Sequence, residues 1–97
     1  MLLKDYIPNI DKKYNRISFS GLAFESSKVK KGNIFFAIKG NNFDGNNFIQ
    51  KAIQKGARVI ISEKNISIKK KNILFIKTQN VRKLLAEISY KIVGQKP

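Results

Sequence analysis

IFFAIKGNNFDGNNFIQKAIQKGARVII, residues 34–61, is the stretch that decides the fold of this 97-residue chain. Its first five residues, Ile34–Ile38, are all apolar, as expected of a strand that is covered on both faces of its sheet. A second strand-like segment, Ala57–Ile61, which is apolar except for Arg58, follows a segment whose apolar residues have helical spacing. Two buried strands joined through a helix form a right-handed crossover with parallel strands. The stretch therefore predicts a parallel βαβ unit.

The connection between these two strands is predicted to be a turn-rich loop, Lys39–Gly45, followed by a helix. Asn46 or Asn47 is expected to cap this helix, which should run to about Lys55, and Asp44 is a further candidate to cap the loop or the helix. Its apolar stripe consists of Phe48, Ile49, Ala52 and Ile53. Gly56 stands where a left-handed residue ends a helix.

Further elements are predicted on both sides of this unit. They are a short helix or turn over Leu2–Ile10, a half-buried strand over Ile17–Ser20, a bend at Gly21 before Leu22–Phe24, a strand over Asn72–Lys77 and a helix over Val81–Val93. A chain of 97 residues has room for one core, so residues 1–97 are predicted to form a single domain. The predicted fold class is α/β, with a small mixed or parallel sheet of about four to five strands and flanking helices.

The composition removes several kinds of chemistry. The chain has neither cysteine nor histidine, which excludes disulfides, thiolate ligands and imidazole bases. Its six carboxylates are dispersed without recognisable pairing, and no phosphate-binding glycine motif occurs. No apolar run approaches the ~20 residues that span a bilayer. We therefore expect a cytoplasmic binding domain with no catalytic residue, no metal site and no membrane partner of its own.

The net charge of +14 comes from 17 lysines and only three arginines. Three interpretations remain open: an A/T-rich codon bias, which would also account for the many Asn and Ile residues, attraction of an anionic ligand, and binding of nucleic acid. Base-specific readers rely on arginine, and the lysines are scattered apart from the run Lys69–Lys71, so nucleic-acid binding is the least favoured.

Four segments carry a resemblance to a known family: ESSKVKKGNIFFAIKG at 25–40, FDGNNFI at 43–49, AIQKGA at 52–57 and LLAEISYKIVGQKP at 84–97. The first three, within about residues 17–62, resemble the N-terminal domain of the Mur ligases at near-constant spacing. The last is similar to the helix that precedes the ATP-binding domain in MurE-type enzymes. MurF-type enzymes share the central pattern but usually lack this tail, so the MurE type is favoured and the MurF type is the alternative.

The resemblance implies a role in peptidoglycan synthesis, and with it in cell-wall biogenesis, cell shape and cell division. A MurE-type ligase uses ATP and magnesium to join a diamino acid, meso-diaminopimelate or L-lysine, to UDP-N-acetylmuramoyl-L-alanyl-D-glutamate. The N-terminal domain holds the uridine-diphosphate end, while the central and C-terminal domains carry out catalysis. On this interpretation the 97 residues bind substrate, hold no cofactor and are not catalytic alone. The third hypothesis, from another class, is a small basic nucleic-acid-binding module.

The resemblance places five residues at the substrate. Phe24 and Ser26 occupy the strand-end positions that contact the uridine, and Asn41, Asn42 and Phe43 occupy the loop that closes over it. Alternative interpretations stand beside these: Phe24 as a strand-end core residue, and Asn41 and Asn42 as ordinary turn residues. The chain also departs from the usual family pattern. Ser27 replaces an arginine, Asn33 replaces an aspartate and Asn46 replaces a histidine.

Overall fold

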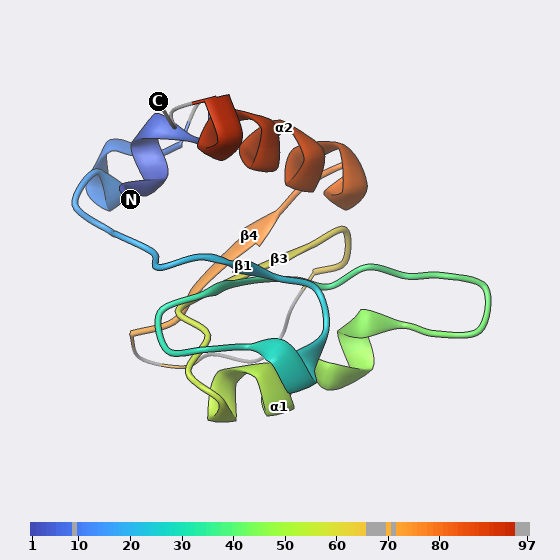
Figure 1. Cartoon of the computed structure of the whole chain (residues 1–97). Helices are drawn as coiled ribbons and strands as arrows, with labels where there is room; N and C mark the ends of the chain where they lie inside the picture. Colours follow the sequence, from blue (N-terminus) through green and yellow to red (C-terminus); the bar gives the residue numbers. More distant parts are fainter. Residues whose placement is uncertain (9, 66–69, 71, 95–97) are drawn as a thin grey trace.

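The computed structural model describes residues 1–8, 10–65, 70 and 72–94. Over these residues four strands form one sheet in the order β1-β2-β3-β4, and all neighbouring strands are parallel. The strands are β1 (Leu22–Ala23), β2 (Ile34–Phe36), β3 (Val59–Ser62) and β4 (Leu74–Lys77). Two α-helices, α1 (Ile49–Gln54) and α2 (Val81–Gly94), lie on opposite faces of this sheet (Figure 1). The predicted α/β fold is confirmed, and the sheet is wholly parallel.

The predicted βαβ unit is present at the centre of the sheet. Helix α1 connects β2 to β3, and Ile34 is paired with Val59 and Phe36 with Ile61. Gly56, between α1 and β3, has φ +111°, as its predicted role as a left-handed helix terminator requires. A Cβ there would also lie 2.8 Å from Lys31 Cα, so this position favours glycine on two counts.

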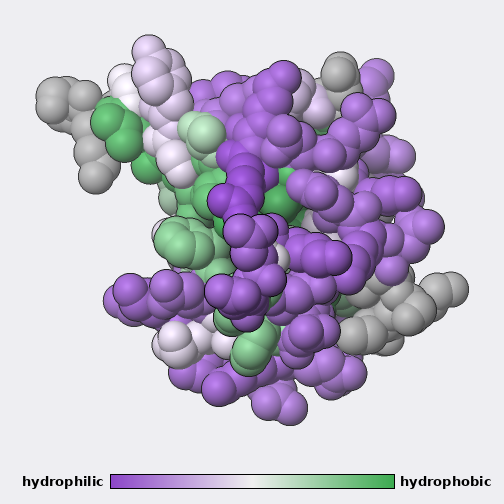
Figure 2. Space-filling model, turned by 90° about the vertical axis from the view of Figure 1, so that its right-hand side faces the viewer, coloured by the Kyte–Doolittle hydropathy of each residue, from purple (hydrophilic) through white to green (hydrophobic). Residues whose placement is uncertain are grey.

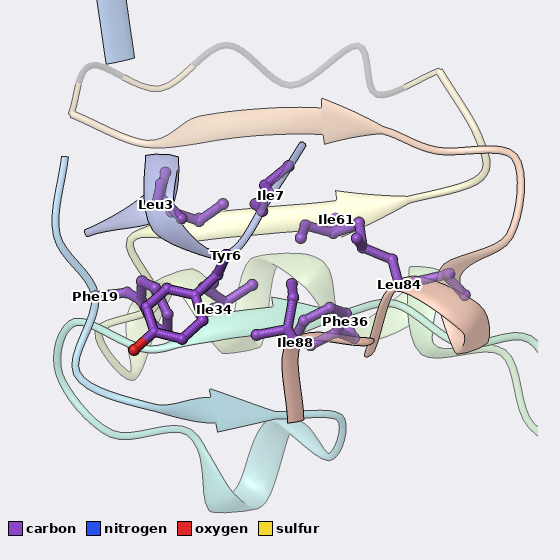
Figure 3. Close-up of a cluster of buried hydrophobic side chains, with 11 residues drawn as sticks. Leu3, Tyr6, Ile7, Phe19, Ile34, Phe36, Ile61, Leu84 and Ile88 are labelled. Carbon is purple, nitrogen blue, oxygen red and sulfur yellow. The ribbon is translucent and has the colours of Figure 1, made fainter. Parts of the chain in front are cut away.

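One face of the sheet packs against α2 and the N-terminal segment. The buried residues of this layer are Leu3, Tyr6, Ile7, Phe19, Ile34, Phe36, Val59, Ile61, Val81, Leu84 and Ile88 (Figure 3). The rings of Tyr6 and Phe19 meet edge to face, with their centroids 5.3 Å apart. Lys91 Nζ donates to the Tyr6 carbonyl at 3.2 Å, which joins the last turn of α2 to the N-terminal segment.

The opposite face packs against α1 and the short 3-10 helix Ser26–Lys28. Its buried residues are Ala23, Val29, Phe35, Ala37, Ile49, Ala52, Ala57 and Ile60. Phe35 therefore lies on one side of β2 while Ile34 and Phe36 lie on the other, all three fully buried. The continuous apolar run predicted a strand covered on both faces, and that prediction is confirmed.

The strand predicted at Ile17–Ser20 does not form as an element of the sheet. This segment makes only an isolated antiparallel bridge, between Leu2 and Ser18, and the strand that joins the sheet is Leu22–Ala23. Phe19 N donates to the Met1 carbonyl at 2.8 Å, and Leu3 N donates to the Ile17 carbonyl at 2.9 Å. Buried and exposed residues do alternate along this segment, but it is the N-terminal segment that packs over its buried side chains. There the predicted helix or turn over Leu2–Ile10 is a 3-10 helix of three residues, Leu3–Asp5.

The start of the first predicted helix also needs correction. A 3-10 helix, Gly45–Phe48, precedes α1, and the capping side chain is that of Asp44, which accepts from Asn46 N. The second predicted helix is confirmed as Val81–Gly94. Glu63 Oε2 accepts from Val81 N at 2.9 Å, so a residue distant in sequence caps α2.

Two predictions made from sequence fall wholly or partly outside the described residues: the basic run at 69–71 and the tail at 95–97. Among the helices that the structure does describe, none is long and apolar enough to span a membrane.

A cleft at the carboxyl ends of β1 and β2 as candidate functional site

A cleft of about 540 Å³ opens where β1 and β2 end. Its lining residues are Phe24, Glu25, Ser26, Ser27, Ile38, Gly40, Phe43, Phe48, Lys51 and Arg82. They come from the segment after β1, the segment between Ile38 and Phe48 after β2, helix α1 and the first turn of α2. Ligands of open parallel sheets bind outside the carboxyl ends of the strands, so the cleft lies at the expected edge.

One wall of the cleft is a tight turn between Lys39 and Asp44, here called the 39–44 hairpin. These two residues form an antiparallel bridge, and Gly40 N donates to the Phe43 carbonyl at 2.6 Å. At its base, Gly45 N donates to the Ile38 carbonyl at 2.8 Å. The hairpin projects from the body of the molecule at the right of Figure 1.

Two phenyl rings form the apolar part of this wall. Phe43, from the hairpin, stacks on Phe48 with a centroid separation of 5.0 Å and an interplanar angle of 13°. Phe43 remains 48% exposed and Phe24, at the end of β1, is 52% exposed. Figure 2 faces the side on which the hairpin projects, and there hydrophobic residues reach the surface between hydrophilic ones. Half-exposed aromatic rings that line a cleft offer flat surfaces to a planar ligand.

A polar network holds the hairpin against the sheet. Asp44 accepts from both Asn46 N, at 2.9 Å, and Asn46 Nδ2, at 2.7 Å, and it pairs with Lys64 Nζ at 3.1 Å. Asn46 Oδ1 accepts a short hydrogen bond from the hydroxyl of Ser62, the fully buried last residue of β3. The network therefore connects the base of the hairpin to the centre of the sheet.

These contacts make the stability of the hairpin depend on pH. The two hydrogen bonds from Asn46, and then Lys64, lower the pKa of Asp44 from 3.8 to about 2. A lowered pKa in the folded chain means that the ionised carboxylate stabilises the fold above pH 4, and that this contribution is lost as pH falls towards 2. We expect wild type to be more stable than Asp44→Asn at neutral pH, and the two midpoints of urea unfolding to converge between pH 4 and pH 2. A difference that grows as pH falls would contradict this assignment.

The end of β1 contributes polar groups to the opposite wall. Ser26 is 93% buried, since only 7% of it is exposed, and it begins the 3-10 helix Ser26–Lys28. Glu25 forms an exposed ion pair with Lys28 at 3.7 Å, and Lys55 Nζ donates to the Ser27 carbonyl at 3.3 Å. The short Ser26 side chain can exchange hydrogen bonds with a ligand without filling the cleft.

The structure brings together three of the five residues that the sequence placed at the substrate. Phe24, Ser26 and Phe43 all line the cleft, although Phe24 and Phe43 belong to different walls. Asn41 and Asn42 are exposed in the turn of the hairpin and are not among the lining residues. Both lie next to Gly40 and Phe43, which do line it.

Sequence reasoning missed two cations of the cleft, Lys51 and Arg82. Helical spacing placed Lys51 on the solvent side of its helix, and Arg82 stood between two residues of the apolar face of α2. Phe48 was assigned to the core stripe, yet it supports Phe43 from inside the cleft. Only the packing of α1 and α2 around the hairpin reveals these three positions.

A larger hollow, of about 830 Å³, lies between the N-terminal segment and the start of α2. It contains none of the five residues that the resemblance places at the substrate. Apolar residues such as Ile7, Ile10 and Leu84 line it together with dispersed polar groups. Within the described part of the chain, no three His, Cys, Asp or Glu residues are grouped so that they could hold a metal ion. The smaller cleft is therefore the better candidate.

Comparison with known proteins gives one consistent family. Residues 18–92 match the Mur ligase family, catalytic domain. The 2,6-diaminopimelate ligase for UDP-N-acetylmuramoyl-L-alanyl-D-glutamate of Clostridium tetani is 39% identical over 94 residues, covering 89% of this chain and 19% of the relative. The UDP-N-acetylmuramyl-tripeptide synthetase of Borrelia garinii is 36% identical over 75 residues, which cover 75% of this chain and 15% of that protein.

The fold matches a solved structure from the same group. The crystal structure of MurF ligase from Thermotoga maritima in complex with ADP superposes with a TM-score of 0.64 at 29% identity. That match covers 75% of this chain and 16% of the MurF chain. The chain thus spans about a fifth, or less, of the length of the proteins that it matches.

Proposed function

This chain belongs to the Mur ligase family, and we propose that it is the substrate-binding part of a MurE-type ligase of peptidoglycan synthesis. In this role the cleft at the ends of β1 and β2 binds the uridine-diphosphate end of UDP-N-acetylmuramoyl-L-alanyl-D-glutamate. The complete enzyme would then add a diamino acid, meso-diaminopimelate or L-lysine, in an ATP- and magnesium-dependent reaction. The proposal includes a cytoplasmic location.

The observation that carries this proposal is the meeting of Phe24, Ser26 and Phe43 in one cleft. The first two come from the end of β1, and the third comes from a hairpin that follows β2. A nucleoside needs a flat apolar surface for its base and short polar groups for its ribose and base edge. Phe43, stacked on Phe48, supplies the first, and Ser26 supplies the second.

Catalysis is assigned to the remainder of the enzyme. The described residues include no cluster of acidic side chains that could hold magnesium. The chain also spans only 19% of the Clostridium tetani ligase. We therefore propose that the central and C-terminal domains of a longer chain bind ATP and magnesium and form the amino-acid pocket.

A MurF-type ligase is the second candidate, because the solved structures with similar folds include MurF enzymes. Several sequence relatives are named 2,6-diaminopimelate ligases, which favours the MurE type. The sequence of the amino-acid-binding region, read from the gene, would distinguish the two types, since each type recognises a different amino-acid substrate in that region.

Titration of the ¹⁵N-labelled chain with UDP and with UDP-N-acetylmuramoyl-dipeptide tests the proposal. We expect the shifts to concentrate at the lining residues of the cleft, and Phe43→Ala to weaken binding about tenfold or more, because base stacking is lost. Tyr90→Ala is the matched control, since Tyr90 is 81% exposed on α2 and lies outside the cleft. No perturbation at millimolar ligand, with the chain shown to be folded, would refute the proposal.

The basic nucleic-acid module remains the alternative from another class. Random single-stranded RNA, titrated at low salt in the same experiment, distinguishes it. Salt-dependent retardation of RNA without any UDP-induced shift would favour that function instead.

A further inference from the structure

Arg82 joins two parts of the molecule that are far apart in sequence. It lies in the first turn of α2, and its Nη2 donates to the Lys39 carbonyl at 3.3 Å across a sequence separation of 43 residues. A Cβ built on Gly40 would lie 3.8 Å from the same Nη2. The guanidinium therefore lies against the 39–44 hairpin, where it lines the cleft.

Two backbone amides at the start of α2 are already capped and are therefore not available to an anion. Val81 N already donates to Glu63 Oε2 at 2.9 Å, and Lys83 N donates to Asn80 Oδ1 at 3.0 Å. The caps occupy two of the amides that would otherwise attract a negative group. The charge that α2 brings to the cleft is the guanidinium of Arg82.

This guanidinium has further donors available, and the cleft contains a second cation. A guanidinium carries five N–H donors in a planar fork, and Lys39 takes one of them. Lys51, from α1, lines the same cleft. The one carboxylate among the lining residues, that of Glu25, is paired with Lys28. The cleft therefore has an excess of positive charge beside its aromatic rings.

We propose that Arg82 and Lys51 form the anion-binding end of the cleft and contact the phosphate groups of the ligand. This inference rests on the proposed function, and it adds a residue from α2, outside the motifs of residues 25–57, to ligand recognition. Arginine forms directed, charge-assisted hydrogen bonds with phosphate oxygens, whereas lysine acts as a point charge. The cleft then discriminates by phosphate content as well as by nucleoside, and Arg82 links ligand binding to the position of α2.

The test is to measure binding of uridine, UMP, UDP and pyrophosphate to the wild-type 97-residue chain and to the variants Arg82→Gln, Arg82→Lys, Lys51→Gln and Arg58→Gln. Arg58→Gln is the matched control, because it removes an equal charge from a residue that is exposed and does not line the cleft. We expect wild type to bind UDP at least tenfold more tightly than uridine at low salt. Arg82→Gln should weaken UDP binding about tenfold and leave uridine binding unchanged.

Three further readouts separate direct contact from a structural role. The ³¹P shift of UDP on binding should be reduced by Arg82→Gln, and partly restored by Arg82→Lys. Lys51→Gln should also weaken UDP binding, and pyrophosphate should compete with UDP on wild type but poorly on Arg82→Gln. The losses of UDP affinity caused by Arg82→Gln and by Lys51→Gln should both become smaller as salt is raised, because the contacts are exposed.

The possible outcomes lead to different conclusions. Equal loss of uridine and UDP on Arg82→Gln would overturn the inference in favour of a structural role. A loss no larger than that caused by Arg58→Gln would overturn it in favour of general electrostatic attraction. In both cases UDP still binds wild type, and the proposed function stands. Failure of both uridine and UDP to bind folded wild type would refute the proposed function together with this inference.

Discussion

Phe36→Ala is expected to destabilise the fold by about 3–5 kcal/mol, a large share of the roughly 5–15 kcal/mol that holds a domain of this size together. Phe36 is fully buried in β2 and packs in the cluster between the sheet and α2 (Figure 3). Truncation to alanine removes the buried ring. It leaves a cavity that the surrounding residues fill only in part, because the sheet is covered on both faces. Urea unfolding followed by circular dichroism measures the change.

The matched control is the same truncation at Phe24. This ring is 52% exposed, so Phe24→Ala should lower the stability by less than about 1 kcal/mol. It should nevertheless weaken UDP binding, because Phe24 lines the cleft. Similar losses of stability for the two variants would contradict the assignment of Phe36 to the core and of Phe24 to the cleft.

Gly45→Ala is expected to damage the fold and the cleft together. A Cβ at this position would lie 2.8 Å from Ile38 N and 3.2 Å from Ala37 Cα, both backbone atoms that cannot move aside cheaply. The base of the hairpin must then separate from β2, which breaks the bond from Gly45 N to the Ile38 carbonyl. We expect a loss of about 1–3 kcal/mol in stability, and at least a tenfold loss in UDP affinity because Phe43 is displaced.

Gly40→Ala provides the comparison within the same hairpin. Its added Cβ would meet the Phe43 carbonyl at 3.5 Å and Arg82 Nη2 at 3.8 Å, which are ordinary contacts. This variant should keep its free energy of unfolding within about 0.5 kcal/mol of the wild-type value. Equal destabilisation by the two substitutions would show that the close approach at Gly45 is not the cause.

The centre of the fold followed from sequence because its signals are local. A continuous apolar run, a helical stripe and a terminating glycine are each complete within residues 34–61, and β2, α1 and β3 form there as predicted. The segment Ile17–Ser20 shows the limit of such reasoning. Its alternation correctly predicts which side chains are covered, but the covering partner is Met1–Leu3, which only the folded chain reveals.

The start of α1 was missed for a related reason. Asp44, Asn46 and Asn47 are all good caps by residue type, and composition does not rank them. Asp44 caps because a 3-10 helix comes first, while Asn46 instead accepts from Ser62 on β3. That second bond joins residues 16 apart in sequence, so no local rule predicts it.

The candidate site divides in the same way. Phe24, Ser26 and Phe43 were identified through the resemblance to the Mur ligases, and they converge in the cleft. Lys51 and Arg82 carry no such signal, because a charged residue on a helix normally faces solvent. Their place in the cleft depends on how α1 and α2 pack on the two faces of the sheet.

The strand order β1-β2-β3-β4 has a consequence for how the proposed binding site can evolve. In many doubly wound sheets a crevice forms where successive connections diverge to opposite sides, so the pocket is a property of the topology itself. Here the four described strands advance in one direction, and the 39–44 hairpin instead forms one wall of the cleft. We therefore expect substitutions in the hairpin between Lys39 and Asp44 to change the ligand preference of the proposed site while the sheet is kept.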